Sequence, residues 1–211
     1  MTPGVATAED FLRLFDVSRE TSDRLLILHD LTLKWNRSVN LIARGTEPAL
    51  WGRHIADSAQ LWALRPPFFG HWVDIGAGAG FPGLVVAVLA AELDPGMRMT
   101  LVESDGRKSV FLAEAARAMR LSVRTLNARV ETLEPLQADV LSARALAPLD
   151  RLLAHAHKHR VPGGIGLFLK GRTVHKEIAA ADLKWRFERR LHCSLTEPGA
   201  AIVEVGTVSS V

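Results

Sequence analysis

Apolar residues recur at helical spacing along the first third of the chain. One apolar stripe covers residues 11–15, a second covers 25–35, and a third covers 46–62, before a Pro-Pro pair at 66–67. Repeats of this period place apolar side chains on one face of a helix, and proline then disfavours its continuation. The pattern therefore predicts three helices within residues 7–63.

After the Pro-Pro pair, the pattern changes to short apolar runs separated by helical stretches. Helical spacing is found at about residues 82–92, 107–120 and 148–160. Strands that alternate with helices of this length imply right-handed crossovers and a mostly parallel sheet. The seven predicted strands lie at residues 71–75, 99–103, 122–126, 138–142, 164–170, 187–195 and 201–205.

The last two predicted strands are joined by only five residues, 196–200. A loop that short makes an antiparallel hairpin but no parallel crossover. A parallel sheet that ends in such a hairpin is the arrangement of the class I methyltransferases, which have a Rossmann-like α/β fold. We therefore expect an N-terminal helical extension, residues 1–65, packed on a methyltransferase domain, residues 66–211, the two forming one structural unit.

A glycine-rich segment follows the first predicted strand. Glycines at this place let the chain turn sharply and let a ligand approach the backbone closely. Glu103 ends the next strand, where an acid can accept hydrogen bonds from both hydroxyls of a ribose. These features together predict a cofactor that contains adenosine. The candidates in the first segment are Asp74, Gly76, Ala77, Gly78, Gly80 and Phe81.

Residues 78–83 also match the dinucleotide fingerprint G-x-G-x-x-G, but three features disfavour NAD. The first glycine after the strand is Gly76, so the fingerprint is out of register with the strand. Phe81 and Pro82 stand where a helix would need to pack closely on the strand. Asp74 favours the positively charged S-adenosylmethionine and would repel a pyrophosphate.

The segment from Asp74 to Gly83, together with Glu103-Ser104, resembles the cofactor motif of one bacterial family. This family is the small-subunit rRNA guanine-N7 methyltransferases, called RsmG or GidB. Ser142 stands one residue further from Arg144 than is common in that family, so the resemblance rests on the arginine rather than the serine. Further matches stand in the family's order, at Trp35–Leu41, Arg53–Ser58, Arg129–Glu131, Ser142–Ala145 and Lys170-Gly171.

The resemblance implies methyl transfer from S-adenosylmethionine to N7 of a guanine in the 530-loop of 16S rRNA. It places Gly76 and Phe81 in the cofactor loop and Arg144 beside the reacting end of the cofactor. The other implied cofactor contacts are Glu103 and Ser104 at the ribose, and Val130 and Glu131 near the adenine.

The chemistry of this acceptor requires no general base. Guanine N7 carries a lone pair and no proton at neutral pH, so the enzyme mainly aligns the reacting atoms and excludes water, which can supply about 7–11 kcal/mol. No Ser-His-Asp or Cys-His arrangement is evident, and we assign no catalytic acid or base. Two alternatives stay open: a methyltransferase of the same class that acts on a small molecule or protein, and a non-catalytic RNA-binding protein with a vestigial cofactor pocket.

Positive charge is concentrated in the last third of the chain. The net charge is +3 overall, whereas residues 147–211 alone hold 10 Lys/Arg and 6 Asp/Glu. Such a surface attracts phosphate, although an ordinary solvated surface has the same composition. The candidates for RNA contacts are Lys34, Arg37, Arg53, His54, Lys158, Arg160, Lys170 and Arg172.

Three histidines, His155, His157 and His159, are spaced like metal ligands at first sight. Only the first and last share a helix face and no acidic residue adjoins them, so we expect no metal and assign them to the basic surface. Cys193 is the only cysteine, which excludes an internal disulfide and fits a reducing compartment. Neither a signal peptide nor a membrane-spanning run is evident. We therefore expect a cytoplasmic monomer whose partner is 16S rRNA or the small ribosomal subunit.

Overall fold

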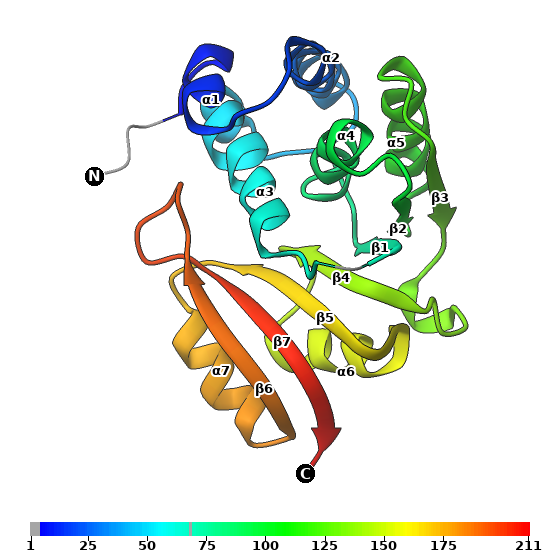
Figure 1. Ribbon diagram of the computed structural model, residues 1–211, viewed down its shortest axis with the longest axis vertical. Coiled ribbons are helices and arrows are strands. Elements are labelled where there is room, and N and C mark those ends of the chain that lie inside the picture. The colour runs from blue at the N-terminus through cyan, green and yellow to red at the C-terminus, as the bar shows by residue number, and fades with distance from the viewer. Residues whose placement is uncertain (1–4, 68) are drawn as a thin grey trace.

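The computed structural model describes residues 5–67 and 69–211. A seven-stranded sheet forms its centre, in the order β3-β2-β1-β4-β5-β7-β6 (Figure 1). β1 to β5 pair in parallel, whereas β7 is antiparallel to both β5 and β6. This confirms the predicted class I methyltransferase-like fold. The strands are β1 (His71–Ile75), β2 (Arg98–Glu103), β3 (Val123–Asn127), β4 (Ala138–Arg144), β5 (Arg160–Lys170), β6 (Trp185–Cys193) and β7 (Ala201–Ser210).

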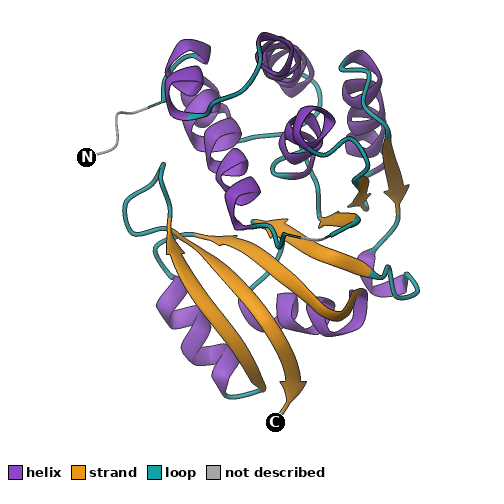
Figure 2. Cartoon of the chain, in the orientation of Figure 1, coloured by secondary structure: helices purple, strands orange, loops and turns teal. Residues whose placement is uncertain are grey.

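Helices cover both faces of the sheet (Figures 1 and 2). α4 (Gly83–Leu93) and α5 (Gly106–Ala118) lie on one face, and α6 (Leu149–His159) and α7 (Val174–Asp182) lie on the other. Asp105 begins α5 by accepting hydrogen bonds from two backbone N–H groups of its first turn. The sequence pattern did not predict α7.

The N-terminal extension is helical as predicted, but its third part is not one regular helix. α1 (Ala8–Leu14) and α2 (Arg19–Asn36) are ordinary helices. The third part divides into a 3₁₀ segment η1 (Arg44–Ala49), a π-helical segment η2 (Trp51–Ala56), a short α3 (Asp57–Ala59) and a 3₁₀ segment η3 (Gln60–Leu64). π-helical turns are rare in proteins, and those that occur are often found at functional sites.

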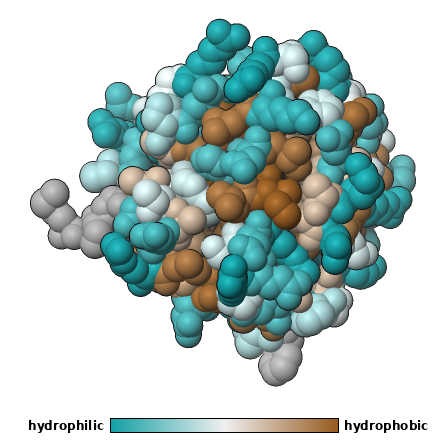
Figure 3. Space-filling model, turned by 90° about the horizontal axis from the view of Figure 1, so that it is seen from above, coloured by the Kyte–Doolittle hydropathy of each residue, from teal (hydrophilic) through white to brown (hydrophobic). Residues whose placement is uncertain are grey.

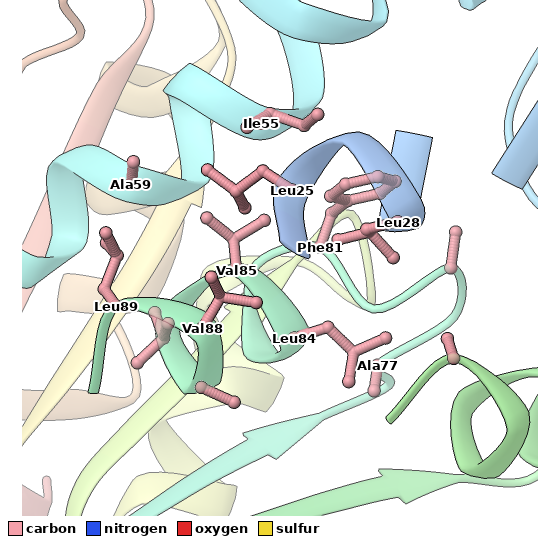
Figure 4. Packing of buried hydrophobic residues seen from close by; sticks show 14 of the residues in the cluster. Leu25, Leu28, Ile55, Ala59, Ala77, Phe81, Leu84, Val85, Val88 and Leu89 are labelled. Atoms are coloured by element: carbon pink, nitrogen blue, oxygen red, sulfur yellow. The ribbon is translucent and has the colours of Figure 1, made fainter. Parts of the chain in front are cut away.

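The extension packs on α4 and α5 rather than on the sheet itself. α2 and α3 both contact α4, and their apolar side chains belong to the same buried cluster as those of α4. Seen from the helical side, apolar side chains gather near the centre of the surface, with hydrophilic ones around them (Figure 3). In Figure 4, the side chains that meet in this layer include Leu25, Leu28, Ile55, Ala59, Val85, Val88 and Leu89.

Asn36 ends α2 and shapes the segment that follows. Its Oδ1 accepts hydrogen bonds from the backbone N–H groups of Leu41 and Ile42, and its Nδ2 donates to Glu47. These hydrogen bonds bring residues 41–43 beside the carboxyl ends of β4 and β5. Among the described residues, no helix is long and apolar enough to cross a membrane.

Candidate functional site

The glycine-rich loop follows β1 and lies at the carboxyl ends of the parallel strands. Gly76, Gly78 and Gly80 have φ angles of +65°, +55° and +81°, a region that side chains other than glycine rarely adopt. The loop is tied to β2, because the Gly78 N–H donates to Glu103 Oε2 at 2.8 Å. The turn that the sequence predicted is therefore made by backbone conformations that require glycine.

Asp74 lies beneath this loop and is fully buried. Its carboxylate accepts a hydrogen bond from the Gly83 N–H at 3.0 Å and another from the Ser142 hydroxyl at 2.6 Å. Burial raises the pKa of Asp74 to about 7. Asp74 supports the loop and the start of α4 from below, and its contact with a positively charged donor stays a prediction. Ser142, on which the resemblance to the family does not rest, belongs to this buried network.

Arg144, at the end of β4, connects the sheet to the N-terminal extension. One guanidinium nitrogen donates to the Arg53 carbonyl at 2.9 Å, and the other donates to His54 Nδ1 at 2.6 Å. The same guanidinium lies 3.7 Å from the Asp57 carboxylate and 5.4 Å from the ring centroid of Phe81. Arg144 thus joins β4, the π-helical turn and the glycine-rich loop at one point.

His54 is held in one protonation state by this arrangement. Burial, followed by the charge of Arg144, lowers its pKa to about 3. Arginine has no acceptor, so Nδ1 of the neutral ring accepts the proton of Arg144 and Nε2 carries the proton towards Thr46 Oγ1, 3.0 Å away. The ring also packs against Phe81, with 5.2 Å between ring centroids.

Asp57 holds the loop between β6 and β7 against the extension. Its Oδ1 accepts hydrogen bonds from Gln60 Nε2, from the Ser194 hydroxyl and from the Thr196 hydroxyl. Burial raises the pKa of Asp57, and the Arg144 charge opposes that rise. Arg53, which could have paired with Asp57 one helical turn away, instead lies 3.6 Å from Glu197.

A cavity of about 460 Å³ opens between these elements. Its walls come from the segment after α2, from the π-helical turn, from the ends of β4 and β5, and from the β6–β7 loop. Arg144 and Ala145 lie on the wall nearest the glycine-rich loop. Ligands of parallel α/β sheets bind outside the carboxyl ends of the strands, so this cavity is the candidate site for the acceptor. The charged residues that line it are Arg53, Asp57, Arg144, Lys170, Glu177 and Glu197, and the neutral His54 lies among them.

Comparisons with known proteins agree with this geometry. Residues 22–202 match the family model described as rRNA small subunit methyltransferase G. A ribosomal RNA small subunit methyltransferase G of Cereibacter sphaeroides is 51% identical, over 93% of this chain and 94% of its own length. A protein of that name from Paramagnetospirillum magneticum is 46% identical, over 95% and 96%.

The chain belongs to the rRNA small subunit methyltransferase G family. The resemblance found in the sequence is thereby confirmed. The methyl donor of this enzyme is S-adenosylmethionine, as predicted.

Solved structures of other proteins have a fold similar to that of this chain. The N-methyltransferase NodS from Bradyrhizobium japonicum, in complex with S-adenosyl-L-homocysteine, has a TM-score of 0.56 at 14% identity and covers 84% of this chain and 98% of its own. A mutant of MtNAS in complex with S-adenosylmethionine has a TM-score of 0.58 at 17% identity and covers 98% and 86%.

The residues around the glycine-rich loop fit S-adenosylmethionine as the methyl donor. A Cβ atom added at Gly78 would have no atom nearer than 3.7 Å, so the space beside this residue is free for a ligand. Each oxygen of the Glu103 carboxylate accepts one hydrogen bond, from Gly78 or Asp105, and keeps a lone pair for the hydroxyls of a ribose. Leu146 lies against Gly76 and closes the loop on the side of β4.

Two of the basic RNA candidates turn out to be structural. Arg160 donates through Nε and both terminal nitrogens to the carbonyls of Ala156, Gly164, Val205 and Gly206. Lys170 is buried and donates to the Ala147 carbonyl at 2.7 Å and to Glu177 at 2.8 Å. Both are candidates for RNA contacts, and both use most of their protons within the fold; Lys170 keeps one proton and lines the cavity.

The three histidines of α6 do not form a basic surface. His159 is fully buried, and burial lowers its pKa and that of His155. His157 Nδ1 lies 3.1 Å from the Val208 carbonyl. The described residues contain no group of three or more potential ligands that could hold a metal ion. The expected contribution to phosphate binding is therefore wrong for His155 and His159, because the helix turns their face inward, whereas His157 is exposed.

The other candidates occupy two areas of the surface. Lys158 is exposed and donates to the Glu131 carbonyl, beside η4 (Val130–Thr132). Ser104 and the Glu131 side chain are exposed at the same edge, and Val130 is buried beneath them. The exposed basic side chains nearer the extension and the cavity are Lys34, Arg37, Arg53 and Arg172.

Proposed function

We propose that this chain transfers the methyl group of S-adenosylmethionine to N7 of a guanine in the 530-loop of 16S rRNA. Membership of the family supports ribosomal RNA as the substrate over a small molecule or a protein, because the curated relatives carry that substrate in their names. The choice of N7 rests on one observation, which is the lack of a usable base among the described residues of the cavity.

Four side chains at the cavity could in principle accept a proton: His54, Asp57, Glu177 and Glu197. His54 has a pKa lowered to about 3, and its Nδ1 already accepts the Arg144 proton. Asp57 accepts three hydrogen bonds on Oδ1 and faces Arg144 through Oδ2. Glu177 faces Lys170 at 2.8 Å, and Glu197 faces Arg53 and Arg172. A general base needs a lone pair that is free to reach the proton of the acceptor, whereas all four groups face donors or cations of the protein. Such a site suits an acceptor that has no proton to lose.

S-adenosylmethionine supplies a methyl group on a positively charged sulfur, and the lone pair of guanine N7 can attack it directly. The chain's own part is to hold the two reactants in line and to keep water out. We assign the cofactor to Gly76, Ala77, Gly78, Gly80 and Phe81, to Glu103 and Ser104, and to Val130 and Glu131. Asp74 acts on it through the loop, and Arg144 positions the reacting end.

We assign RNA backbone contacts to the exposed basic residues around the cavity. Arg53 and Arg172 stand at its mouth, and Lys34 and Arg37 are exposed near the end of α2. Positive charge around a cavity attracts the RNA backbone, so that an unstacked base can enter the cavity. Lys158 lies near the η4 edge and is assigned a weaker, peripheral contact.

The test is the pH dependence of the transfer step. In a single turnover with saturating S-adenosylmethionine, we expect a nearly flat rate between about pH 6.5 and 8.5, because no proton is removed. We expect the positive charge of the bound donor to lower the pKa of the nearby Asp74, so that this carboxyl stays ionised through this range. A limb near pH 7 that disappears when His54 or Asp57 is replaced would show that a base is required, and N7 would be abandoned as the acceptor.

A further inference from the structure

Two exposed arginines from distant parts of the sequence converge on one carboxylate at the mouth of the cavity. Arg53 belongs to the π-helical turn, Arg172 follows β5, and Glu197 lies in the β6–β7 loop. Glu197 Oε2 is 3.6 Å from Arg53, and Oε1 is 3.8 Å from Arg172. The side chains of Arg53 and Arg172 are 57% and 73% exposed, so a ligand in solvent can reach both.

The Glu197 carboxylate is held there by charge and not by hydrogen bonds. Both distances exceed the 2.7–2.9 Å of a charge-assisted hydrogen bond between a guanidinium and a carboxylate. Exposed ion pairs of this kind are weak, so an anion that fits the two guanidinium groups better can displace the glutamate. An RNA phosphate presents two charged oxygens, as a carboxylate does, and arginine binds it with paired hydrogen bonds.

The loop that carries Glu197 does not depend on this carboxylate for its position. Thr196 donates to Asp57 at 2.8 Å, and the Leu195 N–H donates to Gln60 at 2.9 Å. The stem of Arg172 also passes close to Gly199, where a Cβ atom would lie 3.4 Å from Arg172 Cγ. The glutamate side chain can therefore leave the two arginines while the loop and the arginine stem stay in place.

We propose that Arg53 and Arg172 form a binding site for one phosphate of the RNA backbone, and that Glu197 occupies this site until RNA displaces it. The proposal rests on the proposed function, since it takes the substrate to be RNA. Glu197 lowers the affinity for any polyanion at the mouth of the cavity. It therefore restricts binding to RNA whose other contacts, at the base and along the extension, offset the cost of displacing it.

The test compares the binding of a fluorescent hairpin with the 530-loop sequence of 16S rRNA to a set of variants. In about 50 mM salt, Glu197→Gln should bind about threefold to tenfold more tightly than the wild type, the effect expected from releasing two exposed ion pairs. Its affinity should also fall more steeply with salt, by up to about 0.7 log units per log unit of salt. Glu134→Gln, which removes the same charge from an exposed glutamate beyond η4, serves as the matched control and should change neither quantity.

A second set separates a specific site from a general effect of charge. When Arg53 and Arg172 are both replaced by alanine, the further change Glu197→Gln should no longer tighten binding, because its effect acts through those arginines. Equal affinity and salt dependence of Glu197→Gln and wild type would overturn the phosphate site and leave the rRNA substrate standing. Tightening that persists without the arginines would overturn it as well. Failure of the wild type and of Glu197→Gln to bind either the hairpin or the small ribosomal subunit at any salt concentration would overturn the proposed function and, with it, this site.

Discussion

Asp74→Asn removes the charge of a carboxyl that the fold buries completely. The asparagine keeps the shape of the side chain: Oδ1 can accept from the Gly83 N–H, and Nδ2 can donate to the Ser142 oxygen. Burial raises the pKa of the native carboxyl from 3.8 to about 7. The substitution therefore changes the free energy of unfolding mainly through charge, and by an amount that depends on pH.

The sign follows from the direction of the shift. Between about pH 4 and pH 7, the folded protein keeps the Asp74 proton and the unfolded chain has lost it. Raising the pH in this window lowers the stability of the wild type by about 1.4 kcal/mol per pH unit, to a total of about 4 kcal/mol, and the loss is complete above about pH 7. Asparagine has no proton to lose, so the variant is spared this loss.

The wild-type profile alone would not reveal the effect, because His54 acts in the opposite direction. Its folded-state pKa is lowered to about 3, whereas the unfolded chain takes up a proton below about pH 6.5. Stability from His54 is therefore present above pH 6.5 and is lost as the pH falls. The difference between Asp74→Asn and wild type cancels this contribution and isolates the carboxyl.

The assay is urea unfolding of both proteins at intervals from pH 5 to pH 8.5, without cofactor. We expect the stability of Asp74→Asn relative to wild type to grow by roughly 3 kcal/mol between pH 5 and pH 7 and then to stay level. Ser142→Ala removes two hydrogen bonds, one donated to Asp74 and one accepted from Trp72. The first of them stabilises the ionised carboxylate, so the loss of stability in Ser142→Ala should grow as Asp74 ionises and should be smallest at pH 5. A difference between Asp74→Asn and wild type that does not change with pH would refute the raised pKa.

Three further outcomes follow from the geometry of the site. Gly83→Ala should lower the free energy of unfolding by about 1–3 kcal/mol in urea titrations, because its Cβ would lie 2.3 Å from Leu101 Cδ2 and 2.9 Å from Asp74 Cβ. Gly76→Val should abolish S-adenosylmethionine binding in calorimetry, since a branched side chain opposes the φ of +65° and collides with Leu146. Arg144→Lys should slow single-turnover transfer about tenfold to a hundredfold at every pH, because lysine lacks the planar fork that donates to the extension. A limb in the pH profile of that variant would contradict its positioning role.

The architecture could be predicted from the sequence because its signals are local. Each strand is a short apolar run that ends in a turn residue, and the short 196–200 connection leaves only a hairpin between β6 and β7. α7 was missed, although its buried residues Val174, Ile178 and Ala181 stand at helical spacing. Its nine residues are too few for that period to stand out from an irregular segment.

The irregular part of the extension could not be predicted in this way. Apolar spacing over residues 46–62 indicates a helical segment but does not distinguish α, 3₁₀ and π turns. The π-helical turn places the Arg53 carbonyl and His54 toward Arg144, so it matters for the site. The strand bounds deviate for a similar reason: β5 begins at Arg160, where the pattern still continued the preceding helix.

The same distinction between local and long-range signals applies to the site residues. The glycines and Glu103 follow from their place at strand ends, where only local sequence is needed. The contacts of Arg144 with His54, and of Ser142 with Asp74, join residues 90 and 68 positions apart. A single sequence does not show which of many polar residues meet across such distances. For the same reason, the basic character of Arg160 and Lys170 was visible but not their internal partners.

The position of the transferred methyl group tests the central claim most directly. Methyl-labelled S-adenosylmethionine is supplied with the protein to 16S rRNA from cells that lack this methylation, and the labelled nucleotide is mapped and released for identification. The account predicts a single labelled guanine in the 530-loop, carrying the label on N7. Label on another base, on another atom of guanine, or outside the 530-loop would contradict it, as would a chain that binds the cofactor and labels no RNA.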